Sequence, residues 1–205
     1  MPSTAWELGS QPLPRDSDWL LPFSPALAEL GERCLELGCG PGLDAATLTG
    51  AGFEVVAFDR APLSRARVAA PETSLVRADL AQHLPFRDAS FDCAVSSLAM
   101  HYLPWAGTRA AFEEVRRVLR RGTPFVFRVN ASDDVNHGAG QGEELEPGFY
   151  RTPTAYHSET KRFFDEAMVR AAVDGLFEVE HLAHRTIHRY EQPKEVWECL
   201  GRARG

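Results

Sequence analysis

LELGCGPG, residues 35–42, is the stretch of this 205-residue sequence that decides its fold. A short apolar run at Arg33–Leu37 predicts a buried strand, and Leu43–Leu48 predicts a helix directly after the stretch. The glycines between them are Gly38, Gly40 and Gly42. Glycine has no Cβ, so a backbone built from it can approach a ligand closely. In an open α/β sheet, ligands bind beyond the carboxyl ends of the strands, so this turn is a candidate ligand site.

Strands and helices alternate along the chain as far as residue 130. The predicted strands are Arg33–Leu37, Glu54–Phe58, Ser74–Ala78, Phe91–Ser97 and Pro124–Val129. The predicted helices are Leu43–Leu48, Leu63–Ala70 and Trp105–Arg121. This alternation is typical of a mostly parallel sheet with helices on both faces.

The rest of the chain follows a different pattern. Residues 1–31 are rich in proline and suggest an arm or lid, and residues 131–157 are rich in glycine and suggest an insertion or lid loop. A helix is predicted over Ser158–Val173, followed by an antiparallel pair of strands at Phe177–His188 and Val196–Ala203. We expect a single domain over residues 1–205.

Composition narrows the classes of function. The chain has 29 acidic and 22 basic residues and a formal net charge of −7, so nucleic acid is a poor first candidate for its substrate, and a local basic patch stays open as an alternative. Lys161 and Lys194 are its only lysines, and the sequence assigns them no role. No apolar run reaches the roughly 20 residues of a membrane span. The four cysteines form no C-x-x-C pair. We therefore expect a cytoplasmic protein without nucleic-acid or membrane partners.

The glycine spacing bears on the kind of ligand. A dinucleotide site has the pattern G-x-G-x-x-G, whereas here Leu43 stands where its third glycine would fall. Glu36 is also unusual beside a pyrophosphate. Asp59 ends the second strand, 21 residues after Gly38, where an acid can accept hydrogen bonds from ribose hydroxyls.

LELGCGPG resembles motif I of class I S-adenosylmethionine-dependent methyltransferases, and later segments resemble that family's motifs in the expected order. They are VVAFDRA (55–61), VRADLAQHLPF (76–86), FDCAVSSLAMHYL (91–103) and EEVRRVLRRGTPFVF (113–127). The resemblance covers residues 33–130, and its usual Pro-Gly-Gly turn is here Arg-Gly-Thr. It implies a small-molecule enzyme of the methyltransferase type 11 kind. Its fold would be a Rossmann-like, seven-stranded, mostly parallel sheet with a terminal antiparallel strand.

The resemblance also implies a cofactor site for S-adenosylmethionine, with S-adenosylhomocysteine as product. Asp79 would accept from the adenine amino group, the Leu80 N–H would serve a ring nitrogen, and Ser96 would lie beside the methionine part. The full set of candidate cofactor residues is Glu36, Gly38, Cys39, Gly40, Asp59, Arg60, Asp79, Leu80 and Ser96.

His101, just past the fourth strand, is the candidate catalytic residue, either as a base or by positioning the acceptor. A histidine that packs on the cofactor or caps a helix is the other interpretation. Candidate substrate-binding residues are Tyr102, Arg128, Tyr150 and His157. No metal site is expected. An NAD-dependent oxidoreductase and a non-catalytic S-adenosylmethionine-binding scaffold remain alternatives, and the acceptor and the oligomeric state stay open.

Overall fold

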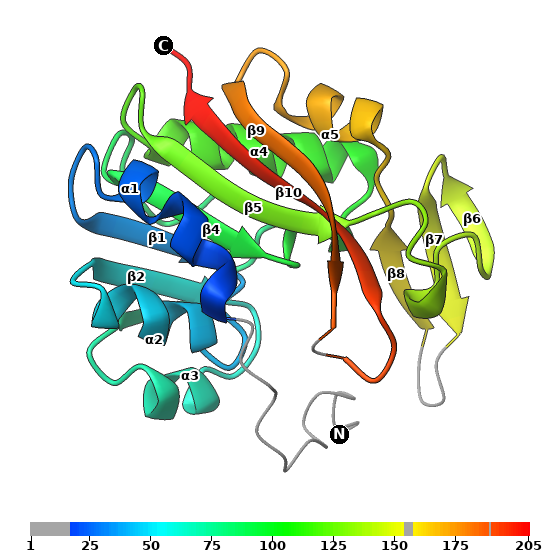
Figure 1. Ribbon diagram of the computed structural model, residues 1–205, viewed down its shortest axis with the longest axis horizontal. Helices are drawn as coiled ribbons and strands as arrows, with labels where there is room; N and C mark the ends of the chain where they lie inside the picture. Colours follow the sequence, from blue (N-terminus) through cyan, green and yellow to red (C-terminus); the bar gives the residue numbers. More distant parts are fainter. Residues whose placement is uncertain (1–16, 154–157, 189) are drawn as a thin grey trace.

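The computed structural model describes residues 17–153, 158–188 and 190–205. Its main sheet has seven strands in the order β3-β2-β1-β4-β5-β10-β9 (Figure 1). The bounds are β1 Arg33–Leu37, β2 Glu54–Asp59, β3 Ser74–Arg77, β4 Cys93–Ser97, β5 Pro124–Asn130, β9 Phe177–Ile187 and β10 Lys194–Ala203. Strands β1 to β5 are parallel, whereas β10 runs antiparallel to both of its neighbours. The predicted seven-stranded fold and its closing antiparallel pair are confirmed.

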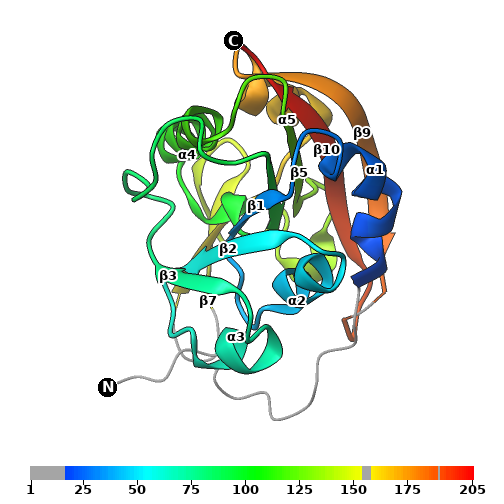
Figure 2. The same cartoon turned by 90° about the vertical axis from the view of Figure 1, so that its left-hand side faces the viewer.

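Helices cover both faces of this sheet, which explains why its central strands β1, β4 and β5 are almost entirely buried. One face carries η2 (Ser17–Phe23), α1 (Ser24–Leu27), α2 (Leu43–Gly50) and α3 (Ser64–Ala69), and the other carries α4 (Trp105–Val118) and α5 (Glu166–Val173). Figure 2 shows α1 and α2 on the opposite side of the sheet from α4. Each face has its own apolar cluster, and every residue of β5 is buried between them. No helix in the described parts of the chain is long and apolar enough to cross a membrane.

The N-terminal segment lies against the sheet. Trp19 and Phe23 are buried in the cluster formed with α2, and the Trp19 Nε1–H donates to Asp44 Oδ1 at 3.1 Å. For residues 17–31, the expected lid is therefore replaced by short helices that cover one face of the sheet. The earlier part of that prediction, residues 1–16, lies outside the described residues.

A second, three-stranded antiparallel sheet was not predicted. It consists of β6 (Glu143–Glu146), β7 (Phe149–Pro153) and β8 (Ser158–Arg162), in the order β6-β7-β8. The loop expected over residues 131–157 is wrong where β6 and β7 form, and so is the helix expected from Ser158. Helix α5 begins only after Asp165, whose side chain accepts from the Met168 N–H at 2.7 Å as an N-cap. The SETKR sequence of β8 is extended because β7 supplies its backbone partners.

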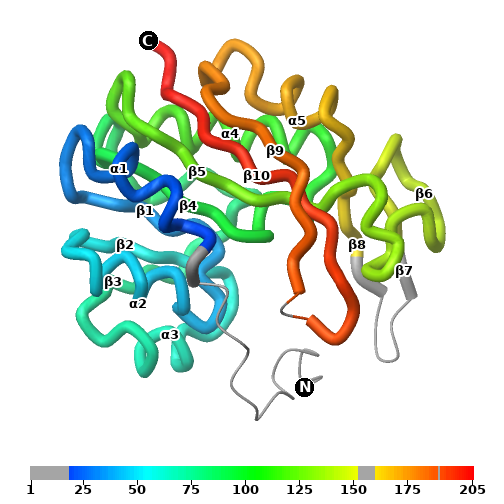
Figure 3. The backbone as a smooth tube through the Cα atoms, viewed as in Figure 1, coloured from blue at the N-terminus to red at the C-terminus, as the bar shows by residue number. Residues whose placement is uncertain are grey.

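Arg162 attaches the small sheet to the start of α4. Its guanidinium pairs with Glu146 and donates to the Pro147 carbonyl at 2.9 Å. The same Glu146 carboxylate accepts from the Trp105 N–H at 2.8 Å, at the first residue of α4. Arg162 is fully buried, and these contacts fix β8. Figure 3 shows β8 beside the end of the main sheet.

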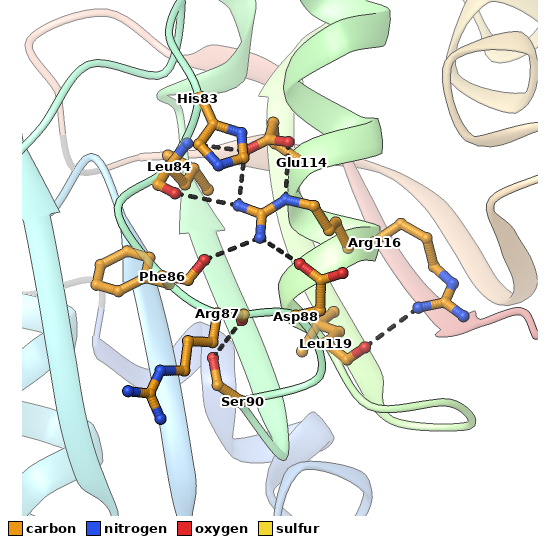
Figure 4. Close-up of polar contacts among 10 residues, drawn as sticks. His83, Leu84, Phe86, Arg87, Asp88, Ser90, Glu114, Arg116 and Leu119 are labelled. Carbon is orange, nitrogen blue, oxygen red and sulfur yellow. Dashed lines mark hydrogen bonds and ion pairs between the residues drawn. The ribbon is translucent and has the colours of Figure 1, made fainter.

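Helix α4 also holds the segment that follows β3. Arg117 donates to the carbonyl oxygens of Leu84 and Phe86 at 3.0 and 2.8 Å, and it pairs with Asp88 and Glu114 (Figure 4). The hydrogen bonds from Arg117 lower the pKa of Glu114. This network fixes residues 84–88, which begin within the expected adenine segment, residues 76–86.

We expect Arg117→Ala to lower the free energy of unfolding by about 2 kcal/mol, because two backbone carbonyls and two carboxylates lose a partner. Arg116→Ala is the matched control, since Arg116 lies on the same helix and donates to the Leu119 carbonyl. Urea denaturation of both variants is the measurement. Equal losses in the two variants would contradict the role given to Arg117.

Candidate functional site

The glycine turn after β1 is fixed by backbone hydrogen bonds to β2. The N–H groups of Gly38 and Cys39 donate to the Phe58 carbonyl at 2.9 and 3.0 Å, and that of Gly42 donates to the Cys39 carbonyl at 2.8 Å. All three glycines have positive φ, at 68°, 48° and 82°. Such values favour glycine because a Cβ is strained there.

The three glycines differ in what surrounds them. A Cβ added at Gly38 would lie 2.3 Å from the Ala99 Cβ, and one added at Gly42 would lie 2.8 Å from the Ala66 Cα. A Cβ added at Gly40 would meet no heavy atom within 4 Å. Gly38 and Gly42 are therefore required by packing, whereas Gly40 borders open space.

That open space belongs to a cavity of about 570 Å³ at the carboxyl ends of the parallel strands, here called the large cavity. Its volume falls in the range of sites that enclose a whole small molecule. It is lined by Glu36, Gly38, Cys39, Gly40, Pro41, Leu43, Asp44, Phe58, Asp59, Arg60, Ala78, Asp79, Leu80, Ser97, Leu98, Ala99, Tyr102, Leu103 and Tyr190. All expected cofactor residues except Ser96 are among them. Ser96 is buried and its hydroxyl donates to the Leu37 carbonyl at 3.4 Å, while the next residue, Ser97, lines the cavity instead.

Glu36 is the most unusual group of the large cavity. It is only 3% exposed, and its Oε2 has no hydrogen-bond partner among the described residues. Burial, reinforced by the charges of Asp44 and Asp59, raises the pKa of Glu36 well above its usual value. A buried acceptor left without a partner costs about 1–3 kcal/mol. The site is therefore suited to a ligand that brings a cation or a hydrogen-bond donor to this oxygen.

Two further carboxylates lie where neighbouring strands end: Asp59 is the last residue of β2, and Asp79 comes two residues after β3. Asp59 accepts from the Gly40 N–H and the Ala61 N–H, each at 2.9 Å, and Asp79 accepts from the Ala81 N–H at 2.9 Å. A carboxylate has about four acceptor positions, so both retain capacity for a ligand. Burial raises the pKa of Cys39 to about 12, so its thiol is a neutral part of the wall.

A second cavity of about 160 Å³, here called the small cavity, adjoins the first. It is lined by Leu98, His101, Tyr102, Asn130, His137, Lys161, Tyr190 and Lys194. Leu98, Tyr102 and Tyr190 line both cavities, so the two are neighbours.

His101 is buried in the wall of the small cavity, in η3 (Met100–Tyr102), with its ring 4.3 Å from that of Tyr102. Its Nδ1 has no partner among the described residues. Burial, followed by the charges of Lys194 and Lys161, lowers the pKa of His101 well below its usual value. The ring is therefore neutral at neutral pH and can accept a proton.

Two expected substrate residues, Arg128 and Tyr150, are not brought to either cavity. Arg128 pairs with Glu198 at 2.9 Å and lies 4.3 Å from the Trp19 ring, so it holds the N-terminal helices instead of lining a site. Tyr150 lies on β7 and packs on Phe163. His157 lies outside the described residues.

Sequence reasoning missed Asn130, Lys161, Tyr190 and Lys194. Asn130 carried a usable signal, since it is a polar residue at the carboxyl end of a buried strand. The others come from β8, from the β9–β10 hairpin and from the start of β10, and no local pattern places those segments beside His101.

The fold and the position of the large cavity are those of an open α/β sheet that binds a ligand beyond the carboxyl ends of its strands. A family model described as a methyltransferase domain matches residues 35–127, so this part of the chain is similar to that family. The range runs from β1 into β5. Of the three described residues that line both cavities, it includes Leu98 and Tyr102 but not Tyr190.

Individual relatives show the same similarity to methyltransferases. An uncharacterized methyltransferase of Synechocystis sp. is 34% identical over 109 residues, which is 52% of this chain and 51% of that protein. The chain thus spans about half the length of the curated relatives it matches. The fold matches a S-adenosylmethionine-dependent methyltransferase of Methanosarcina mazei with a TM-score of 0.78 and 17% identity, over 89% of this chain and 97% of that one.

A second structure similar in fold is the 1,6-didemethyltoxoflavin-N1-methyltransferase of Burkholderia thailandensis, with bound 1,6-didemethyltoxoflavin and S-adenosylhomocysteine. Its TM-score is 0.67 and its identity 17%, over 93% of this chain and 80% of that one.

Proposed function

We propose that this protein transfers the methyl group of S-adenosylmethionine to a small molecule. The observation that carries the proposal is the unpartnered, buried Glu36 oxygen in a cavity bordered by Gly40 and Asp59. Bound S-adenosylmethionine supplies a methyl group on a sulfonium, which an acceptor takes by in-line displacement. The protein's part is to hold both partners in line and to exclude water.

The residues of the large cavity fit this cofactor. Glu36 would hold the ammonium of its methionine part, because a cation satisfies the orphaned oxygen. Asp59 would accept from the ribose hydroxyls and Asp79 from the adenine amino group, with the Leu80 N–H and Arg60 beside them. Gly40 would leave room for the ligand backbone. A pyrophosphate fits poorly, since it would place negative charge beside Glu36, which argues against an NAD-dependent enzyme.

His101 would face the acceptor. A neutral imidazole with an open Nδ1 can take a proton from a hydroxyl or an acidic group as the methyl is transferred. Tyr102 lines both cavities and would separate cofactor from acceptor.

A small acceptor is supported by the volume of the small cavity, about 160 Å³, and by the net charge of −7, which disfavours nucleic acid. The Burkholderia enzyme that shares the fold is named for a small heterocyclic acceptor. In this proposal residues 1–205 act as one domain in the cytoplasm, where the four free, buried cysteines would stay reduced.

Calorimetric titration with S-adenosylhomocysteine and with NAD tests the cofactor assignment. We expect binding of the first and none of the second, and tight binding of NAD alone would overturn the proposal. Methyl-labelled S-adenosylmethionine is then incubated with separate small-molecule, protein and RNA fractions of a cell extract. Label in the small-molecule fraction is expected, whereas binding without transfer to any fraction would favour a scaffold.

The pKa of Glu36 gives a further prediction. In the free protein the raised pKa keeps Glu36 protonated above its usual range, and a bound ammonium lowers that pKa, so binding releases a proton. Affinity for S-adenosylhomocysteine should therefore rise with pH, by up to about tenfold per unit, until the pH passes the free-state pKa. Titrations from about pH 5 to pH 7 stay below the pKa of about 8 of an α-amino group.

Glu36→Gln is the matched variant, because its side chain has the same shape and does not titrate. Its affinity should vary little over this range. Parallel pH profiles for the two proteins would show that Glu36 does not face the ligand's ammonium.

A further inference from the structure

The small cavity has a positively charged wall. Lys161 on β8 and Lys194 at the start of β10 are the only lysines in the sequence, and both line it. Within residues 17–153, 158–188 and 190–205, no acidic side chain lines it. Their field reaches His101, since both lysine charges lower its pKa. Because two segments far apart in the sequence bring their lysines together here, the cavity favours a negatively charged group.

The position of the Lys194 side chain is fixed by Asp134. Its Nζ donates to Asp134 Oδ2 at 2.6 Å, and the same carboxylate accepts from the Glu195 N–H at 3.0 Å and contacts His137 Nδ1 at 2.9 Å. Asp134 is buried and does not line the cavity. The lysine is therefore fixed in one position in the wall of the small cavity.

Asn130 adds a hydrogen-bond donor and an acceptor to the small cavity, and an anion alone would satisfy only the donor. It is 0% exposed, and neither its Nδ2 nor its Oδ1 has a hydrogen-bond partner among the described residues. His101 Nδ1 also has no hydrogen-bond partner among the described residues. Buried polar atoms nearly always have partners, so these atoms await a ligand with both acceptor and donor groups. The volume of about 160 Å³ suits a compact group of a larger molecule that extends toward the large cavity.

We propose that the small cavity binds the methyl acceptor through a carboxylate with a neighbouring O–H or N–H, so that the acceptor is a hydroxy- or amino-carboxylic acid. The lysines and Asn130 Nδ2 donate to the carboxylate, and the neighbouring O–H or N–H donates to Asn130 Oδ1 or His101 Nδ1. This inference rests on the proposed function, since it names the acceptor of the same site.

The test uses two probes that differ in charge: lactate, and its neutral isostere lactamide. The full-length protein is first saturated with S-adenosylhomocysteine, whose own binding is measured. Each probe is then titrated, and binding is followed by the amide NMR shifts of residues 130–137 and 161. We expect lactate to bind about tenfold more tightly than lactamide, in keeping with a charge-assisted contact. Equal affinities, or no binding of lactate, would overturn the inference.

Asn130→Asp and Asn136→Asp form a matched pair. The first places a like charge inside the small cavity and should weaken lactate binding by about tenfold or more. The second makes the same change on exposed η4 (Val135–His137), where Asn136 donates to the Pro193 carbonyl, and should change it little. Equal effects of both variants would overturn the inference.

Lys161→Met provides an independent variant should Asn130→Asp not fold, and it too should weaken lactate binding. Normal lactate affinity in Lys161→Met would count against the inference. Failure to bind S-adenosylhomocysteine would refute the proposed function instead. Binding of S-adenosylhomocysteine without a preference for lactate would refute only the acceptor class.

Discussion

Gly40→Ala is expected to weaken binding of S-adenosylhomocysteine by about 100-fold while the protein stays folded. The added Cβ meets no protein atom within 4 Å, and Gly40 lines the large cavity, so the new methyl group occupies ligand space. Overpacking of this kind costs about 1–3 kcal/mol, and we expect the upper part of that range. The positive φ of 48° adds about 1–2 kcal/mol of strain to the folded state. Calorimetry gives the affinity, and thermal unfolding gives the stability.

Gly38→Ala is the matched comparison for Gly40→Ala, because the same substitution at Gly38 should lower the stability of the folded protein. Its Cβ would lie 2.3 Å from that of Ala99, so the glycine turn and the segment after β4 must separate. We expect a larger fall in melting temperature for Gly38→Ala than for Gly40→Ala. Normal affinity in a folded Gly40→Ala protein would show that the ligand does not approach this glycine.

Asp59→Ala is expected to weaken binding of S-adenosylhomocysteine by about 1–3 kcal/mol, or roughly 10- to 100-fold. The change removes the acceptor proposed for the ribose hydroxyls. It also frees the N–H groups of Gly40 and Ala61, which Asp59 holds at 2.9 Å, so the glycine turn loses part of its support.

Glu54→Ala is the control for Asp59→Ala, since it removes a carboxylate from the opposite end of the same strand, β2. Glu54 is exposed and pairs with Arg33 at 3.6 Å. Exposed pairs contribute about 0–1 kcal/mol to stability, so neither affinity nor folding should change much. An unchanged affinity in Asp59→Ala would contradict the ribose assignment.

The first half of the fold could be predicted from the sequence because its signals are local. Apolar runs, glycines and acids at strand ends marked β1 to β5, and Arg33–Leu37 was predicted with the observed bounds. Helix α4 ends at Val118, earlier than the predicted Arg121, because Leu119 turns extended and bridges Phe91.

The second half could not be predicted in the same way because its structure depends on tertiary contacts. The polar SETKR segment becomes β8 through pairing with β7, and buried Arg162 is stable there only because Glu146 and two aromatic rings surround it. Arg128 was expected at the site from its place near the end of β5. Its side chain does not line either cavity, because it pairs with Glu198 on the neighbouring antiparallel strand β10.

The antiparallel direction of β10 has a consequence for how proteins of this architecture diverge. Because β10 runs against β5, its first residue, and the hairpin before it, reach the rim where the parallel strands finish. In our proposal, insertions or exchanges in that hairpin would change the choice of acceptor and leave Glu36, Asp59 and Asp79 in place. In our proposal, the carboxylates that would bind the nucleoside lie within the range that the family model matches, whereas Asn130, Lys161 and Lys194 of the small cavity lie beyond residue 127.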